Sequence, residues 1–336
     1  MKKNFLISFI LIFISTFSVL SQTSTRKEID RPMADKGPTK VTVYAAILNI
    51  NEIDAAAQTI TCNVYFAATW KDVRLTHNSK MSIIKPIDEI WNPQIVIVNR
   101  QNMILTMPNE AEIQPDGTVI YRQRIFGQFS QNLDFRNFPF DRQNFKIVLV
   151  AADYNPEEVE FSVDSVQQTF LSKELTVKDW DILSFYGISK PYSVIPGAKS
   201  NASMSFEITA ERKSSYYIFS FMIPFFLIIM MSMGVFWLDP KLPSPQISVA
   251  VTSMLTLIAY RFTIADSLPK ISYLTRMDIF IFCSSVLIFL TFSEAIVTIA
   301  LAAKSKEALA MRIDLYSRWV FPVIYAIVIL IAFVIY

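Results

Sequence analysis

Hydroxyl, apolar and acidic residues recur at helical spacing along one apolar segment of the chain. At intervals of four, three, four, three and four residues the sequence places Ser248, Thr252, Leu255, Ala259, Phe262 and Asp266. Residues three and four apart lie on one face of an α-helix, so the six form a single stripe. Hydroxyls replace the lost hydration of an ion and apolar rings can close a water path, so the stripe is typical of a pore lining. The alternative is a polar face packed inside a helix bundle, with Ser and Thr bonded to neighbouring helices.

The sequence offers little for other kinds of chemistry. Its one histidine, His77, excludes a multi-histidine metal site, and none of its six glycines forms a phosphate-binding loop. We therefore expect no metal, no cofactor and no enzyme. A net charge of +2 gives no basic field for nucleic acid. The two cysteines, Cys62 and Cys283, fall in a strand-like and in an apolar helical segment, so we expect no disulfide.

The elements that would position the stripe are membrane spans. The chain is 52% hydrophobic, too apolar for an ordinary soluble protein of its 336 residues. Four apolar segments are each long enough for a hydrocarbon core of about 30 Å, and they cover residues 216–237, 247–268, 278–302 and 319–336. The connection 303–318 carries four basic residues and favours the cytoplasmic side. Glu294 should face protein rather than lipid. Its role could range from a structural hydrogen bond to proton sensing.

The N-terminal half has a different pattern. Residues 1–21 have a Lys2-Lys3 start, a short apolar run and a small-polar end, which predicts a secretory signal peptide, the alternative being a further membrane helix. A flexible lead-in, 22–38, follows. In 39–212, short alternating segments are separated by turn residues, as in Pro115-Asp116-Gly117. About ten strands over roughly 170 residues predict an antiparallel β-sandwich, which the membrane region 213–336 follows.

Residues 133–145 read Leu-Asp-Phe-Arg-Asn-Phe-Pro-Phe-Asp-Arg-Gln-Asn-Phe. This run resembles the signature loop of the pentameric ligand-gated ion channels, the Cys-loop receptor superfamily. Animal members carry cysteines at the positions of Gln131 and Phe145, so the chain resembles a prokaryotic-type member without that disulfide. Trp70-Lys-Asp72-Val-Arg74-Leu75 and Trp91-Asn-Pro93 resemble two further family motifs, and we interpret Trp91 as structural.

The pore helix resembles the family as well. Thr252-Ser-Met-Leu255-Thr256, followed by Ser267-Leu-Pro269-Lys270-Ile-Ser272-Tyr273, is similar to the family's pore helix and its linker. The resemblance implies a homopentamer in a bilayer, with gates at Leu255 and Phe262 and passage of monovalent ions. It also implies a bacterial inner membrane, with the β domain on the extracytoplasmic side. The inner mouth, Pro243-Ser244-Pro245-Gln246, carries neither family selectivity charge, and five Asp266 carboxylates favour cations.

The resemblance also implies a ligand site between subunits. Tyr65 matches an aromatic position on the complementary side, and three tyrosines remain on the principal side: Tyr154, Tyr186 and Tyr192. Val98 and Ala152 stand where aromatics are usual, which argues against a quaternary ammonium. A small amine, another small molecule or protons remain as the agonist. The alternative for each tyrosine is ordinary strand packing.

Signal transmission needs charges where the β domain meets the membrane. Arg212 matches the family's pre-membrane arginine, and its expected partners are Asp141, beside Pro139, and Glu52 or Asp54. Pro269 and Lys270 would pass the movement to the pore helix. The alternative is an arginine that extends to the membrane surface. For the whole chain, the alternative to a channel is a membrane-anchored binding module without ion conduction.

Overall fold

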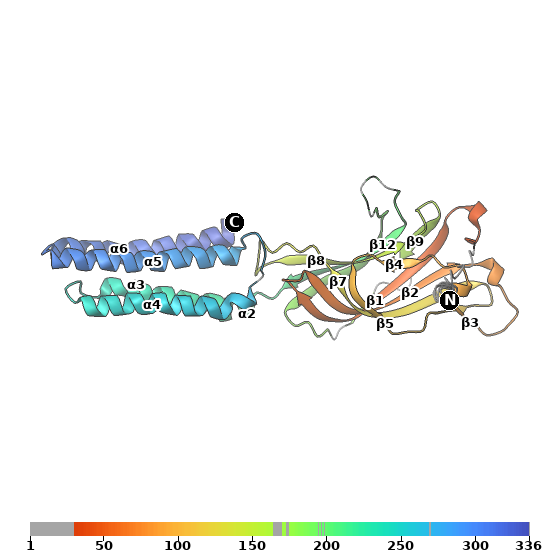
Figure 1. Ribbon diagram of the computed structural model, residues 1–336, viewed down its shortest axis with the longest axis horizontal. Helices are drawn as coiled ribbons and strands as arrows, with labels where there is room; N and C mark the ends of the chain where they lie inside the picture. The colour runs from red at the N-terminus through yellow and green to blue at the C-terminus, as the bar shows by residue number, and fades with distance from the viewer. Residues whose placement is uncertain are drawn as a thin grey trace, which may run out of the picture.

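The computed structural model describes residues 30–335 apart from 164–169, 173–174, 194, 196, 198 and 269, and the side chains of 266 and 335 are also outside the description. The predicted signal peptide, 1–21, and Pro269 therefore lie outside the described residues. A β domain and a set of four long helical segments lie end to end (Figure 1). The predicted order of a β half followed by a helical half is confirmed.

The β domain is a sandwich of two sheets. In chain order its strands are β1 (Thr39–Asp54), β2 (Thr59–Lys71), β3 (Ile83–Pro86), β4 (Ile95–Ile97), β5 (Arg100–Leu105), β6 (Glu110–Ile113), β7 (Thr118–Ser130), β8 (Arg142–Ala151), β9 (Val159–Val163), β10 (Phe170–Leu171), β11 (Trp180–Ser189) and β12 (Ser203–Arg212). One sheet has the order β10-β1-β2-β7-β6-β3, with β5 on β7 and β9 on β1. The other has the order β11-β12-β8-β4.

Alternating side chains explain why these segments form strands. From Ile60 to Trp70, β2 alternates buried with half-buried residues, as a strand with one face on a core must. The core between the sheets includes Phe129 and Phe145, both fully buried. The expected sandwich is therefore confirmed, with twelve strands in the described part of the chain where about ten were expected.

Two pairings differ from the expected antiparallel pattern. Strands β9 and β10 both run parallel to β1. The chain crosses from the second sheet to the first after β8, so β9 enters beside β1 in the same direction. The described end of the predicted lead-in is also held in place, because Arg31 donates to the carbonyl oxygen of Glu158 at 2.9 Å. Residues 30–38 are thus tied to the sandwich and include a short 3₁₀ turn, η1 (Ala34–Lys36).

Four helical segments are long and apolar enough to cross a membrane. The first, Ser215–Trp237, consists of α2 (Ser215–Tyr217), a π-helical turn η4 (Ile218–Met222), α3 (Ile223–Met233) and a 3₁₀ turn η5 (Gly234–Trp237). The others are α4 (Pro243–Ile264) with turn η6 (Ala265–Ser267), α5 (Arg276–Ala303), and α6 (Glu307–Leu330) with the π-helical turn η7 (Ile331–Ile335).

Two helix starts differ from the sequence prediction. Helix α4 begins at Pro243 rather than at 247, because proline at the first helical position is compatible with a helix start. Helix α6 begins at Glu307 rather than at 319. Its first turns carry the charged residues Arg312 and Arg318, which lower the hydropathy of a segment without preventing a helix. Most of the predicted connection 303–318 is therefore helical.

Candidate functional site

Helix α4 divides its residues between a packed face and an open face. The packed face lies against α3 and α5 and includes Gln246, Ala250, Ser253, Leu257 and Ile264. The open face contains five residues of the predicted stripe: Ser248, Thr252, Leu255, Ala259 and Phe262. Leu255 is 61% exposed and Phe262 is 77% exposed in the single subunit. Asp266 follows in turn η6, and its side chain lies outside the described part of the chain.

The hydroxyl groups of α4 follow the same division. The buried Ser253 donates to the carbonyl oxygen of Val249 at 2.8 Å, within its own helix. Among the described residues, the hydroxyls of Ser248 and Thr252 donate no hydrogen bond to protein. The packing alternative required these hydroxyls to bond to neighbouring helices. Within one subunit they do not, so they remain available to water or to another subunit.

Arg212, the last residue of β12, forms a buried ion pair with Asp141. The guanidinium Nε and Nη2 lie 2.7 and 3.2 Å from the two carboxylate oxygens, and the side chains are 7% and 1% exposed. Gln143 donates a further hydrogen bond to Asp141 Oδ2 at 2.7 Å. The main chains are joined as well, since Arg212 N donates to the carbonyl oxygen of Asp141 at 3.1 Å. Such burial does not fit an arginine that extends to the membrane surface.

Three aromatic rings surround the same guanidinium. Its carbon lies 4.2 Å from the ring centre of Trp180, 5.0 Å from that of Phe138 and 5.8 Å from that of Tyr217. Rings at these distances stabilise a cation that water cannot reach. Phe138 precedes Pro139 in a cis peptide bond. Sequence reasoning missed Trp180 and Tyr217, because one lies on β11 and the other in the first span.

The other two carboxylates predicted for this cluster lie elsewhere. Among the described residues, the ion pair of Arg212 involves Asp141 and neither Glu52 nor Asp54. Asp54 ends β1, and its Oδ1 accepts a hydrogen bond from the main-chain nitrogen of Ala57 at 2.8 Å. This local turn interaction, favoured by aspartate, holds its carboxylate within the β1–β2 hairpin.

The loop before β8 also contacts the linker between α4 and α5. Tyr273 Oη accepts a hydrogen bond from Phe135 N at 2.9 Å. Arg276 N donates to the carbonyl oxygen of Arg136 at 3.0 Å, and the Arg136 guanidinium lies 5.7 Å from the Tyr273 ring centre. Lys270 lies in the same linker. The linker motif contained Tyr273, but sequence reasoning assigned it no contact.

Asn201 connects the two loops that carry Tyr154 and Tyr192. Tyr154 follows β8, and its hydroxyl accepts a hydrogen bond from Trp91 Nε1 at 2.9 Å. Tyr192 forms an isolated antiparallel bridge with Asn201, whose side chain donates to the carbonyl oxygen of Ala152 at 2.8 Å. The loop between β11 and β12 is thereby attached to the loop that carries Tyr154.

Tyr186 belongs to a polar network on the four-stranded sheet. Its hydroxyl donates to Glu207 at 3.2 Å, and Glu207 also contacts Lys146 at 3.1 Å and Asn144 at 2.8 Å. Burial alone would raise the pKa of Glu207, but the bonds from Asn144 and Lys146 outweigh it and hold that pKa below its usual value. The Glu207 charge in turn raises the pKa of the Tyr186 hydroxyl.

Tyr65 lies on β2, in the other sheet. Its ring makes an edge contact with Tyr44 at a centre-to-centre distance of 6.3 Å. The loops that carry Tyr154 and Tyr192 are thus connected through Asn201, whereas Tyr65 lies on a strand of the other sheet. That separation is what a site between two subunits requires, since each subunit would supply one side.

Glu294 on α5 faces protein, as expected for a carboxylate in a span. Both its carboxylate oxygens are buried, and Asp314 of α6 is their neighbour. Asp314 is only 2% exposed, and Thr298 and Ser317 border the pair. The pairing of the two carboxylates could not be predicted, because no local sequence pattern specifies how α5 and α6 are rotated against each other.

Comparison with known proteins covers both halves of the chain. The family model of the neurotransmitter-gated ion-channel ligand binding domain matches residues 20–214, and that of the neurotransmitter-gated ion-channel transmembrane region matches 221–309. A proton-gated ion channel of Gloeobacter violaceus is 26% identical over 298 residues, which are 88% of this chain and 82% of the relative.

Two animal proteins are similar over a smaller share of their own length. A gamma-aminobutyric acid receptor subunit beta-4 of Gallus gallus is 26% identical over 79% of this chain and 56% of its own. A gamma-aminobutyric acid receptor subunit beta of Caenorhabditis elegans is 26% identical over 75% of this chain and 47% of its own. The chain therefore spans about half the length of these two relatives.

Proposed function

Because the chain belongs to the neurotransmitter-gated ion-channel family of Cys-loop receptors, we propose that it opens a cation pore lined by α4 when a signal reaches its β domain. The observation that carries this proposal is the open face of α4. Leu255 and Phe262 are largely exposed in one subunit, although the opposite face of the same helix is packed. Five copies around an axis would turn these faces toward water and toward one another.

The composition of the open face supports conduction with two constrictions. Among the described residues of one subunit, the hydroxyls of Ser248 and Thr252 donate to no protein group, so they can replace part of the hydration shell of a monovalent ion. Rings of Leu255 and of Phe262 are apolar and would exclude water when narrow, which closes the path. Five Asp266 carboxylates at one mouth would concentrate cations rather than anions. The proposed assembly is a homopentamer.

The signal would reach the pore through the loop of residues 131–141. On one side this loop holds Arg212, three residues before the first span, and on the other it forms a hydrogen bond with Tyr273, which follows the pore helix. A movement of the loop therefore acts on two membrane segments at once. A packed cluster with two discrete arrangements is a suitable transmission element. Pro139 lies in this loop, and Lys270 lies in the linker that carries Tyr273. Pro269 directly precedes Lys270 in the sequence.

The agonist would bind between subunits, with Tyr154, Tyr186 and Tyr192 of one subunit facing Tyr65 of the next. A small amine fits the aromatic character of this set. Protons are the second candidate, and the similarity to a proton-gated channel favours them. We place the protein in a bacterial inner membrane with the β domain on the extracytoplasmic side.

Current through purified protein in planar bilayers tests the proposal, with pH steps, a panel of small amines and asymmetric salt. A stimulus-dependent current with a cation reversal potential is expected. Leu255→Ser should leave the channel leaky or sensitised, because a hydroxyl ring no longer excludes water. Leu290→Ser on α5 is the matched control, since Leu290 is also exposed, at 45%. If wild type and Leu255→Ser are both silent under every condition, the chain is a membrane-anchored binding module.

A further inference from the structure

Two buried glutamine side chains join the two limbs of the loop of residues 131–141. Gln131 begins the outgoing limb, 131–134, and Gln143 lies on the returning limb, 141–146, at the start of β8. The two residues are 9% and 4% exposed. Each amide uses both of its hydrogens and its oxygen in hydrogen bonds to protein, so its orientation is fixed.

Gln131 pairs with the main chain of Lys146 on the opposite limb. Its Oε1 accepts a hydrogen bond from Lys146 N at 2.8 Å, and its Nε2 donates to the carbonyl oxygen of Lys146 at 2.9 Å. The other Nε2 hydrogen bonds to the carbonyl oxygen of Phe129 at 3.3 Å. A peptide group in a neighbouring strand would offer the same donor and acceptor, so the side chain takes the place of a strand residue.

This pairing covers a part of β8 that lacks a strand neighbour. On the side away from β12, β4 pairs with β8 only at residues 149–151 in the described part of the chain. Asn99 bonds to the same edge, since its Nδ2 donates to the carbonyl oxygen of Lys146 at 2.7 Å. An uncovered edge would present unpaired main-chain groups. Gln131 therefore closes the base of the loop and satisfies its returning limb.

Gln143 forms a second pair nearer to the tip of the loop. Its Oε1 accepts a hydrogen bond from Asp134 N at 3.2 Å, and its Nε2 donates to the carbonyl oxygen of Asp134 at 2.7 Å. The same Nε2 donates to Asp141 Oδ2 at 2.7 Å. Asp141 is the partner of Arg212, so Gln143 connects this carboxylate directly to the outgoing limb.

The contacts of the loop with the linker after α4 begin directly beyond the second pair. Phe135 N donates to Tyr273 Oη at 2.9 Å, and the carbonyl oxygen of Arg136 accepts a hydrogen bond from Arg276 N at 3.0 Å. These contacts belong to the outgoing side of the loop, whereas Arg212 is bound by the returning limb. A displacement of one limb reaches the other only if the two are joined.

We propose that Gln131 and Gln143 are positioning residues that make the two limbs move as one body. Animal members of the family carry cysteines at the positions of Gln131 and Phe145, and this chain closes the loop at that place with hydrogen bonds. The role of the two amides in transmission rests on the proposed function, whereas the closure of the loop does not.

The test is hydrogen exchange of the full-length protein in detergent, compared between wild type, Gln131→Met and Gln143→Met. Methionine keeps an unbranched chain and removes the amide. The reporters are the amide hydrogens of Phe135 and Arg276, which bond across the contact with the linker. Loss of the bonds between the limbs should increase both exchange rates about tenfold or more, whereas amides in β2 keep their rates.

Two further variants sharpen the comparison. Gln101→Met is the matched control, because Gln101 is exposed and donates only to Ser130 Oγ, at 3.0 Å. It should leave the exchange rates of Phe135 and Arg276 unchanged. Gln131→Asn keeps an amide on a chain that is one methylene shorter, so it should raise the same two rates with a smaller disturbance of packing.

Three results would overturn the proposal. The first is exchange at Phe135 and Arg276 that is the same in wild type and in both methionine variants. The second is an equal increase in β2, and the third is that none of the variants at 131 and 143 yields a folded oligomer. Either of these would mean that the two amides support the whole domain rather than position the loop. Because exchange needs no current, a silent channel would contradict the proposed function, while the exchange rates would still decide on the closure of the loop.

Discussion

Asp141→Asn is the most direct test of the contact between the β domain and the first membrane span. The substitution keeps the shape of the side chain and removes its charge. The Arg212 guanidinium would then remain 7% exposed without its carboxylate. Removing one partner of a buried ion pair costs about 3–5 kcal/mol. A domain of this size loses about 2–4 °C of melting temperature per kcal/mol, so we expect a decrease of about 6–20 °C.

The chain supplies a matched control one residue further on. Lys213 pairs with Asp181 at 3.0 Å, but the two side chains are 46% and 64% exposed. An exposed pair contributes at most about 1 kcal/mol, so Asp181→Asn should lower the melting temperature by less than about 4 °C. The assay is thermal unfolding of the full-length protein in detergent, followed by near-ultraviolet circular dichroism and by retention of the oligomer.

A double substitution separates the ion pair from the shape of the site. Asp141→Asn with Arg212→Met removes both charges and leaves an apolar chain among the three aromatic rings. Its loss of stability should be smaller than the sum of the two single losses, because no buried charge is left unpaired. If Asp141→Asn and Asp181→Asn lower the melting temperature equally, burial does not strengthen the Arg212 pair, and our reasoning on the coupling cluster is wrong.

Three further predictions concern single side chains. Tyr273→Phe removes the acceptor of Phe135 N, and the amide hydrogen of Phe135 should exchange faster with solvent, while amides in β2 keep their rates. The lowered pKa of Glu207 makes its contribution to stability full above about pH 5 and lost as the pH falls through that lowered value. The stability difference between wild type and Glu207→Gln should therefore be constant from pH 5 to pH 8, and a change within this range would contradict the assignment. Glu294→Gln removes one of two facing carboxyl groups and should raise the melting temperature at pH 8, whereas the charge-retaining Glu294→Asp should not.

Local patterns in the sequence predict much of this architecture. The alternation in β2 and the length of the apolar segments depend on neighbouring residues, so both halves could be predicted. The five described residues of the α4 stripe are exposed in the single subunit, but so are Val251 and Ile258, and the pore lining stays a prediction. The pairing of Arg212 with Asp141 came from the family resemblance, and the structure places the two within hydrogen-bond distance.

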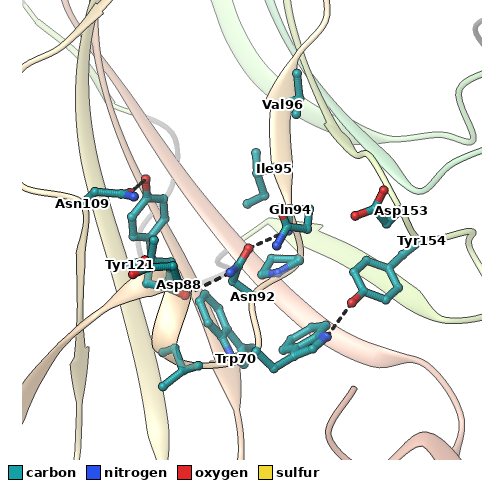
Figure 2. A pocket seen from close by; sticks show the side chains of 14 residues that line it. Trp70, Asp88, Asn92, Gln94, Ile95, Val96, Asn109, Tyr121, Asp153 and Tyr154 are labelled. Atoms are coloured by element: carbon teal, nitrogen blue, oxygen red, sulfur yellow. Dashed lines mark hydrogen bonds between the residues drawn. The ribbon is translucent and has the colours of Figure 1, made fainter. Parts of the chain in front are cut away.

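Features that depend on residues far apart in the chain could not be predicted in this way. The ring nearest to the Arg212 guanidinium belongs to Trp180, which pairs with Arg212 across β11 and β12. The register of that hairpin follows from a bulge between Ile182 and Ser184 that no local pattern indicates. The cavity of about 730 Å³ in the β domain was even less predictable, because side chains from several segments between Trp70 and Tyr154 line it (Figure 2).

The position of β12 has a consequence for how the protein is made. It is the last strand of the β domain in the chain, yet it lies inside its sheet, between β11 and β8. Until β12 has left the ribosome, β11 and β8 expose unpaired edges, which are prone to aggregation. The first membrane span begins at Ser215, three residues after β12 ends at Arg212. Completion of the β domain during biosynthesis therefore nearly coincides with synthesis of the first span, and a chain that ends before Ser203 should aggregate rather than fold.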